Sequence, residues 1–148
     1  MNSEVEPLRI EFPASPDELP GVRSRLRRWL AGMIADSQRA YDLLLAAGEA
    51  CANAIEHGHA GDRRPIRLEA IVARGAVLVG ISDHGHWVAR PAAPDDERGH
   101  TESLRGRGLQ MIKALVHESR VTVLDSGTTV TLSMPLDADG AAEGSQAR

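Results

Sequence analysis

The chain has 148 residues, the size of one domain with a single two-layer core. Its 17 basic and 21 acidic residues are well mixed and leave a net charge of −4, which argues against nucleic acid or an anionic membrane as the main partner. The single cysteine, Cys51, has no intramolecular disulfide partner, as suits a reducing compartment. With neither a signal sequence nor a membrane-spanning apolar run, we expect a soluble, cytoplasmic protein.

The first predicted elements are a short strand and a helix. Residues 8–12 alternate apolar and polar, which is typical of an edge strand half-buried on a core. Ser15 and Glu18 stand at capping-box spacing and predict the start of a helix that ends near Met33. The arginines of this helix are either a solvated face or a basic surface for a partner, and they occupy positions 23, 25, 27 and 28.

A second helix, predicted from Ser37 to Gly58, carries the most informative polar residues. Glu49, Asn53 and His57 are spaced four residues apart, so they share one flank of the helix. This polar line should border a buried stripe of residues at helical spacing, namely Tyr41, Leu44, Leu45, Gly48, Ala52 and Ile55. A carboxylate and an amide at such a border suggest the wall of a pocket. Taken alone, the same pattern also fits a solvated helix edge.

An antiparallel hairpin follows. Residues 66–72 and 77–81 alternate on either side of a turn at Arg74 and Gly75. The alternation continues to Asp83, which places its carboxylate at the end of the core-facing side of the sheet. A charge there is costly unless it meets a hydrogen-bond donor, and a bound ligand could supply one.

Residues 84–104 are rich in Pro, Gly, Asp and Arg without periodicity, and we interpret them as a lid. Gly106 and Gly108 then precede an amphipathic helix that begins near Leu109. Glycines at this position let backbone N–H groups and the positive end of the helix dipole approach an anion such as phosphate. The pair also fits a flexible turn.

The last folded segment is a second hairpin. Residues 121–123 and 128–134 alternate around a turn at Asp125, Ser126 and Gly127, which puts Thr128 on the core side. The remaining residues contain little that could be buried. We therefore expect one domain over residues 1–136 and a disordered tail over residues 137–148.

The motifs together resemble a known family. The stretches EACANAIEHG, ISDHG, RGRGLQMIKAL and GTTVTLSMPL occur in the order and spacing of the ATP-binding domain shared by sensor histidine kinases and gyrase B, the Bergerat fold. They resemble most closely the anti-sigma factor serine kinases of bacteria, over Leu8 to Pro135. The resemblance implies an α/β two-layer sandwich, with a mixed and mostly antiparallel sheet packed on three helices and ATP between the layers.

The resemblance also assigns the adenine side of the site. Asp83 is implied to accept a hydrogen bond from the adenine amino group, and Gly85 to keep the approach of the adenine open. Thr128 is implied to join through a water, and Thr129 beside it to contribute to the nucleotide site.

On the phosphate side, the resemblance implies that Asn53 is a ligand of Mg²⁺, since an amide oxygen suits a hard cation. Glu49 is implied to be the general base that accepts the proton of a partner serine. His57 is implied either to border the phosphate or partner site or to cap the helix.

The glycine-rich segment completes the implied phosphate site. Gly106 and Gly108 are implied to cradle the phosphates, and Arg105 to offer them a charge-assisted contact, while Leu109 is implied to contribute to the nucleotide site.

Two departures from the family pattern decide between functions. The family commonly has D-x-G-x-G where this chain has DHGHW. His86 and Trp87 therefore stand where a second glycine would make the hinge of the lid more flexible. The chain also lacks the phosphoacceptor helix of sensor kinases and the transducer domain of gyrase-like ATPases.

The leading interpretation is an ATP-dependent serine kinase that phosphorylates an anti-sigma factor antagonist and otherwise holds a sigma factor. The alternative is a non-catalytic ATP-binding module that docks on a protein partner. The resemblance also suggests a homodimer built partly on the first strand and helix.

Overall fold

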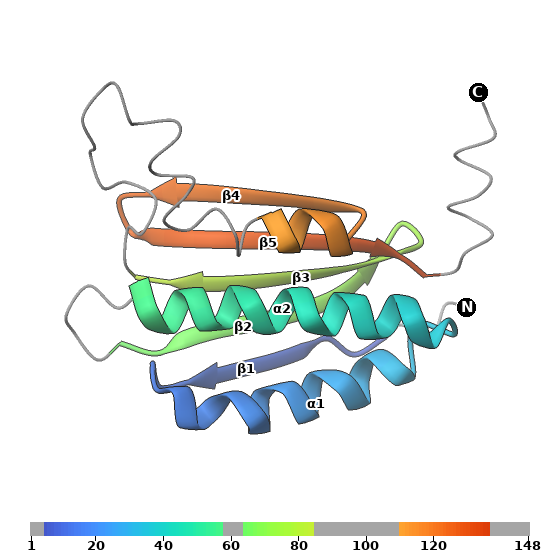
Figure 1. The fold of residues 1–148 in the computed structure, drawn as a ribbon, viewed down its shortest axis with the longest axis horizontal. Coiled ribbons are helices and arrows are strands. Elements are labelled where there is room, and N and C mark those ends of the chain that lie inside the picture. Colours follow the sequence, from blue (N-terminus) through green and yellow to red (C-terminus); the bar gives the residue numbers. More distant parts are fainter. Residues whose placement is uncertain (1–4, 58–63, 85–109, 137–148) are drawn as a thin grey trace.

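The computed structural model describes residues 5–57, 64–84 and 110–136 (Figure 1). Its elements are β1 (Leu8–Phe12), a 3-10 helix (Pro16–Glu18), α1 (Leu19–Ala31), α2 (Ser37–His57), β2 (Ile66–Ala73), β3 (Ala76–Asp83), β4 (Glu118–Leu124) and β5 (Gly127–Pro135). Residues 110–115 are also helical. The predicted lid after residue 84 and the predicted tail lie outside the described residues.

The strands form one sheet in the order β1-β2-β3-β5-β4. Figure 1 shows the helices on a single side of this sheet, with α1 beside α2 and near β1. The predicted two-layer α/β sandwich is confirmed, and β1 is an edge strand as expected. Every pairing among the described strands is antiparallel, so the parallel pair of a mixed sheet is not seen in this part of the chain.

Local capping explains where the helices begin. The Asp36 carboxylate accepts a hydrogen bond from the backbone N–H of Gln38 at 2.9 Å, and α2 starts at Ser37 as predicted. The Ser15 side chain caps the 3-10 helix that leads into α1. None of the helices in the described ranges combines the length and apolar character needed to span a bilayer.

The buried face of α2 differs from the predicted stripe. Tyr41 was expected on that face but is 54% exposed, whereas Leu43, Ala47 and Ala50 are fully buried. The helix meets the sheet on one side and α1 on another, and it presents small alanines to the sheet. These alanines carry little weight in a hydrophobicity pattern, so the predicted stripe was rotated away from the true one.

Two reciprocal ion pairs fix the register of the edge strand. Arg9 pairs with Glu69 at 2.7 Å, and Arg67 pairs with Glu11 at 3.0 Å. Each pair joins residues that lie directly opposite each other on β1 and β2. A slip of one residue would separate both pairs, so they specify register more than they add stability at these exposed positions.

Burial of the Cys51 thiol makes the fold sensitive to alkaline pH. Cys51 is 1% exposed, and its desolvation, opposed by the charge of Arg23, raises the thiol pKa from 9.0 to about 12. Above pH 9 the thiol ionises in the unfolded chain but not in the folded one. The free energy of unfolding should therefore fall as pH rises from 9 toward 12.

Urea unfolding of the wild type and of Cys51→Ala, each at pH 8 and pH 10, tests this linkage. The wild type should lose about 1.4 kcal/mol more than the variant between the two pH values, since one pKa unit is worth about 1.36 kcal/mol. Equal losses in the two proteins would mean that the thiol ionises as readily in the folded state.

Candidate functional site

The core contains three buried polar side chains among the described residues. They are Asn53, Asp83 and Thr128, which are 7%, 5% and 1% exposed, while the other buried side chains of the core are apolar. Asn53 lies near the end of α2, Asp83 ends β3, and Thr128 lies at the start of β5. These element ends lie at the same end of the sandwich (Figure 1). The fold thus concentrates its buried polarity at one place.

Strand register brings Asp83 and Thr128 together. The two residues are direct partners in the β3–β5 ladder, and Val123 of β4 is the partner of Thr128 on its other side. The three side chains therefore form one row across the core-facing side of the sheet. The strand alternation had placed Asp83 and Thr128 on this side, and both placements are confirmed.

Val123 is the residue of this row that sequence reasoning did not assign to the site. It points to the core-facing side, yet it is 36% exposed. The alternation pattern gave its direction, but only the fold shows that nothing among the described elements covers it fully. The row therefore runs from a buried carboxylate to an uncovered apolar side chain, which suits a flat ligand with a polar edge.

Gly127 holds the end of β3 in place. Its φ of +147° lies in a region that favours glycine. A Cβ there would lie against the carbonyl oxygen of Asp83 and within 2.9 Å of the Cα of His84. The sequence had placed Gly127 in the turn, but it is the first residue of β5. Its missing side chain allows β5 to approach the Asp83 backbone closely.

Asn53 presents an unsatisfied amide. Its Nδ2 atom is buried and has no hydrogen-bond partner among the described residues. Leaving a buried donor unpaired costs about 1–3 kcal/mol, so such a group in a core calls for a ligand. A polar amide without a partner fits either a phosphate oxygen or, through its carbonyl oxygen, a hard cation.

Three other predicted site residues lie on the same elements as Asn53, Asp83 and Thr128. Glu49 lies one turn before Asn53 on α2 and is partly exposed. His57 is the last residue of α2, and its side chain lies outside the described part. Thr129 points to the opposite face of the sheet, where its Oγ1 lies 3.0 Å from Ser82 Oγ. Its side chain therefore does not join Asp83 and Thr128.

Five of the predicted site residues fall in the part of the chain that the structure does not describe. Gly85, Arg105, Gly106, Gly108 and Leu109 all lie outside the described residues. Their assignment to a nucleotide site stays a prediction.

Within the described ranges, no group of three or more His, Cys, Asp or Glu side chains could hold a metal ion.

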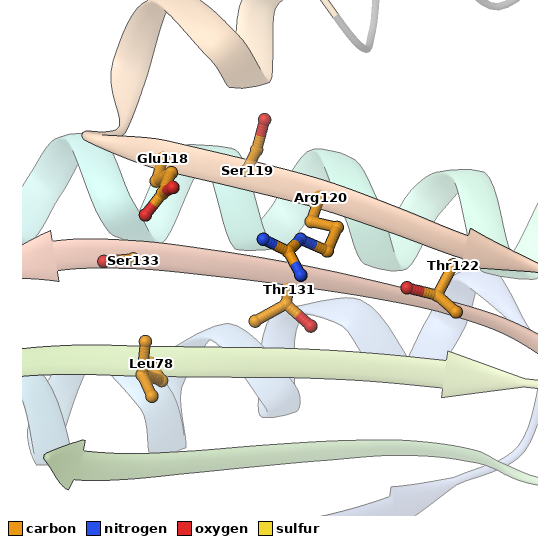
Figure 2. Close-up of a pocket in the computed structure, with 7 residues that line it drawn as sticks. All are labelled: Leu78, Glu118, Ser119, Arg120, Thr122, Thr131 and Ser133. Carbon is orange, nitrogen blue, oxygen red and sulfur yellow. The ribbon is translucent and has the colours of Figure 1, made fainter.

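A separate hollow lies on the uncovered face of the sheet. It has a volume of about 350 Å³ and is lined from β3, β4 and β5 by residues that include Arg120, Thr131 and Ser133 (Figure 2). Thr131 and Ser133 alternate with the core-facing residues of β5, so this hollow lies on the side away from Asn53. It contains none of the residues that the sequence assigned to a site.

Comparison with known proteins gives consistent matches. The profile of the histidine kinase-like ATPase domain matches residues 12–134. The serine-protein kinase RsbW of Bacillus licheniformis is 28% identical over 157 aligned positions, which cover 97% of this chain and 94% of RsbW.

Two solved structures are also similar. The RsbU and RsbW domains of a Mycobacterium tuberculosis protein match with 34% identity and a TM-score of 0.69 over 88% of this chain. This match covers 32% of the solved chain, so the present chain spans about a third of it. The histidine kinase domain of a blue-light-activated kinase from Erythrobacter litoralis, at 22% identity and a TM-score of 0.54, covers 84% of this chain and 61% of its own, and shares the fold.

Two glycines with positive φ offer a matched test of the close approach at Asp83. Gly127→Ala and Gly75→Ala both force alanine into an unfavourable backbone conformation, but an added Cβ meets no atom within 4 Å at Gly75. Gly75→Ala should therefore cost about 1 kcal/mol of unfolding free energy. Gly127→Ala should cost roughly 1–3 kcal/mol more, because the Asp83–His84 backbone must move.

Urea unfolding of the two variants beside the wild type measures the difference. Equal losses would show that β5 has room for a side chain at this position, and that Gly127 does not position Asp83.

Proposed function

Because this chain belongs to the histidine kinase-like ATPase domain family, we propose that it binds ATP and transfers the γ-phosphate to a serine of a protein partner. The near full-length similarity to serine-protein kinase RsbW supports this reaction over the other activities of the family. The partner is then an anti-sigma factor antagonist, and the chain otherwise holds a sigma factor.

The observation that carries the proposal is the meeting of Asn53, Asp83 and Thr128 at one end of the sandwich. Elsewhere in the described core the buried side chains are apolar, so this end is where a polar ligand gains most from entering. A nucleotide matches the arrangement because it has a flat base with polar edges at one end and phosphates at the other.

The row on the sheet suits the base. The Asp83 carboxylate can accept a hydrogen bond from the adenine amino group, and Thr128 beside it can bond a ring nitrogen directly or through water. Val123 offers an apolar surface to the ring. Guanine presents a carbonyl where adenine presents the amino group, so the acidic acceptor favours ATP over GTP.

The α2 residues suit the phosphates. Asn53 would hold Mg²⁺ through its amide oxygen, and this cation, when bound, neutralises charge on the phosphates. Glu49, one turn earlier on α2, would accept the proton of the partner serine hydroxyl. As that proton leaves, the serine oxygen forms a bond to the γ-phosphorus, the bond to the bridging oxygen breaks, and ADP departs with that oxygen.

A second candidate is a non-catalytic ATP-binding module that docks on a protein partner. The DHGHW sequence favours it, because His86 and Trp87 replace the flexible glycine pattern of the family. The two candidates share the nucleotide site and differ only in phosphate transfer, so one experiment separates them.

Glu49→Gln should retain ATP binding and lose phosphate transfer. The amide nearly preserves the shape of the carboxylate but cannot accept the serine proton, and a loss of about 100-fold or more in rate is expected. The measurement is transfer from radiolabelled ATP to an anti-sigma factor antagonist from the same genome, beside calorimetric ATP binding.

Glu56→Gln is the matched control, since it makes the same change seven positions along α2 on an exposed residue, and it should leave transfer unchanged. Transfer by Glu49→Gln at the wild-type rate would exclude Glu49 as the base. A wild type that binds ATP but labels no antagonist would favour the non-catalytic module.

A further inference from the structure

A groove runs along the seam between α1 and α2, which lie side by side in Figure 1. It consists of two adjoining hollows of about 310 and 390 Å³ that share Arg27, Tyr41 and Leu44. Together they extend from Pro20 to Ala31, which is about 16 Å along α1, or about three helical turns.

The groove is separate from the candidate nucleotide site. Leu44 in the groove and Asn53 in the site are nine positions apart on α2. At about 3.6 residues per turn this spacing puts them about 180° apart, on opposite flanks of the helix. A molecule in the groove would therefore leave the Asn53 side of α2 open.

The floor of the groove is apolar. Leu30 and Ile34 contribute buried side chains, and Leu44 forms the wall on α2. Tyr41 is 54% exposed at the edge, although aromatic rings gain most from burial. An apolar hollow with an exposed tyrosine is typical of a protein contact rather than of solvated surface.

The wall on α1 is basic. Arg23 and Arg27 stand one turn apart, both are exposed, and neither has an ion-pair or hydrogen-bond partner among the described residues. A Cβ at Gly48 of α2 would lie 3.4 Å from the Arg23 Cδ, which is an ordinary contact distance, so the stem of Arg23 lies close to α2 across the seam.

The charge of this wall contrasts with that of the whole protein. α1 carries arginines at positions 23, 25, 27 and 28 and no acidic residue, whereas the chain has a net charge of −4. A local excess of positive charge on an acidic protein steers acidic partners to that surface.

From this geometry we infer that the α1–α2 groove binds an amphipathic helix of a protein partner, whose apolar side chains would pack on the floor and against Tyr41 and Leu44. Acidic side chains one turn apart on the partner helix would then face Arg23 and Arg27. A second copy of this chain is a poorer occupant, because docking α1 on α1 would bring arginines together. The inference concerns a contact distinct from phosphate transfer and does not require nucleotide.

The test uses two labelled peptides of about 18 residues, each with leucines at helical spacing. One has glutamates beside the leucines and the other has lysines at the same positions. Fluorescence anisotropy with the full chain should show that the acidic peptide binds at least about tenfold more tightly. Equal affinity of the two peptides would overturn the inference.

Three variants locate the contact. Arg27→Glu should weaken binding of the acidic peptide by about tenfold, and Tyr41→Ala, which leaves the charge unchanged, by roughly fivefold. Arg25→Glu is the matched control, because it makes the same charge change on the flank of α1 that lines a different hollow, and it should change affinity by less than about twofold. Circular dichroism checks that each variant is folded.

Equal weakening by Arg27→Glu and Arg25→Glu would mean that the peptide responds to overall charge, and the groove would not be its site. Binding of the chain to phosphatidylserine vesicles without binding of the acidic peptide would assign the basic surface to a membrane and overturn the inference as well.

Discussion

The structure depends on one constraint, which is that an apolar two-layer core must accommodate a buried carboxylate at the end of β3. Asp83 is 5% exposed and is held there by its ladder partner Thr128 and by the close approach of Gly127. A carboxylate in such a place is costly unless donors meet it. The fold gathers its other buried polar side chain, Asn53, at the same end, and the site described above follows from that arrangement.

The central helix α2 links the two surfaces of the molecule. Its alanines pack on the sheet, one flank presents Asn53, and the opposite flank presents Leu44 to the groove beside α1. A rigid helix of 21 residues keeps these flanks at a fixed angle, so a partner could contact one while a nucleotide occupies the other. The proposed nucleotide site and the proposed groove contact therefore use two sides of one helix.

Much of the fold and part of the site could be predicted from the sequence. Period-two alternation placed Asp83 and Thr128 on the core side, because one face of an antiparallel sheet is buried. The alternation could not reveal that Val123 would be uncovered, since that depends on which elements reach the end of β4.

The helical pattern misplaced Tyr41, because the alanines on the true buried face of α2 are only weakly hydrophobic and contribute little to the pattern. The prediction assigned Thr129 to the nucleotide site together with Thr128, but adjacent residues of a strand face opposite sides of the sheet, and Thr129 contacts Ser82 instead.

The most direct test of the central claim is where a nucleotide binds. Titration of ¹⁵N-labelled protein with MgADP, followed by NMR, should shift the backbone amides of Asp83 and Thr128 and the side-chain amide of Asn53. The amides of Arg120 and Thr131, which line the hollow on the opposite face of the sheet, should stay unchanged. Shifts confined to Arg120 and Thr131, or no shifts at millimolar nucleotide, would contradict the assignment of the buried polar end as a nucleotide site.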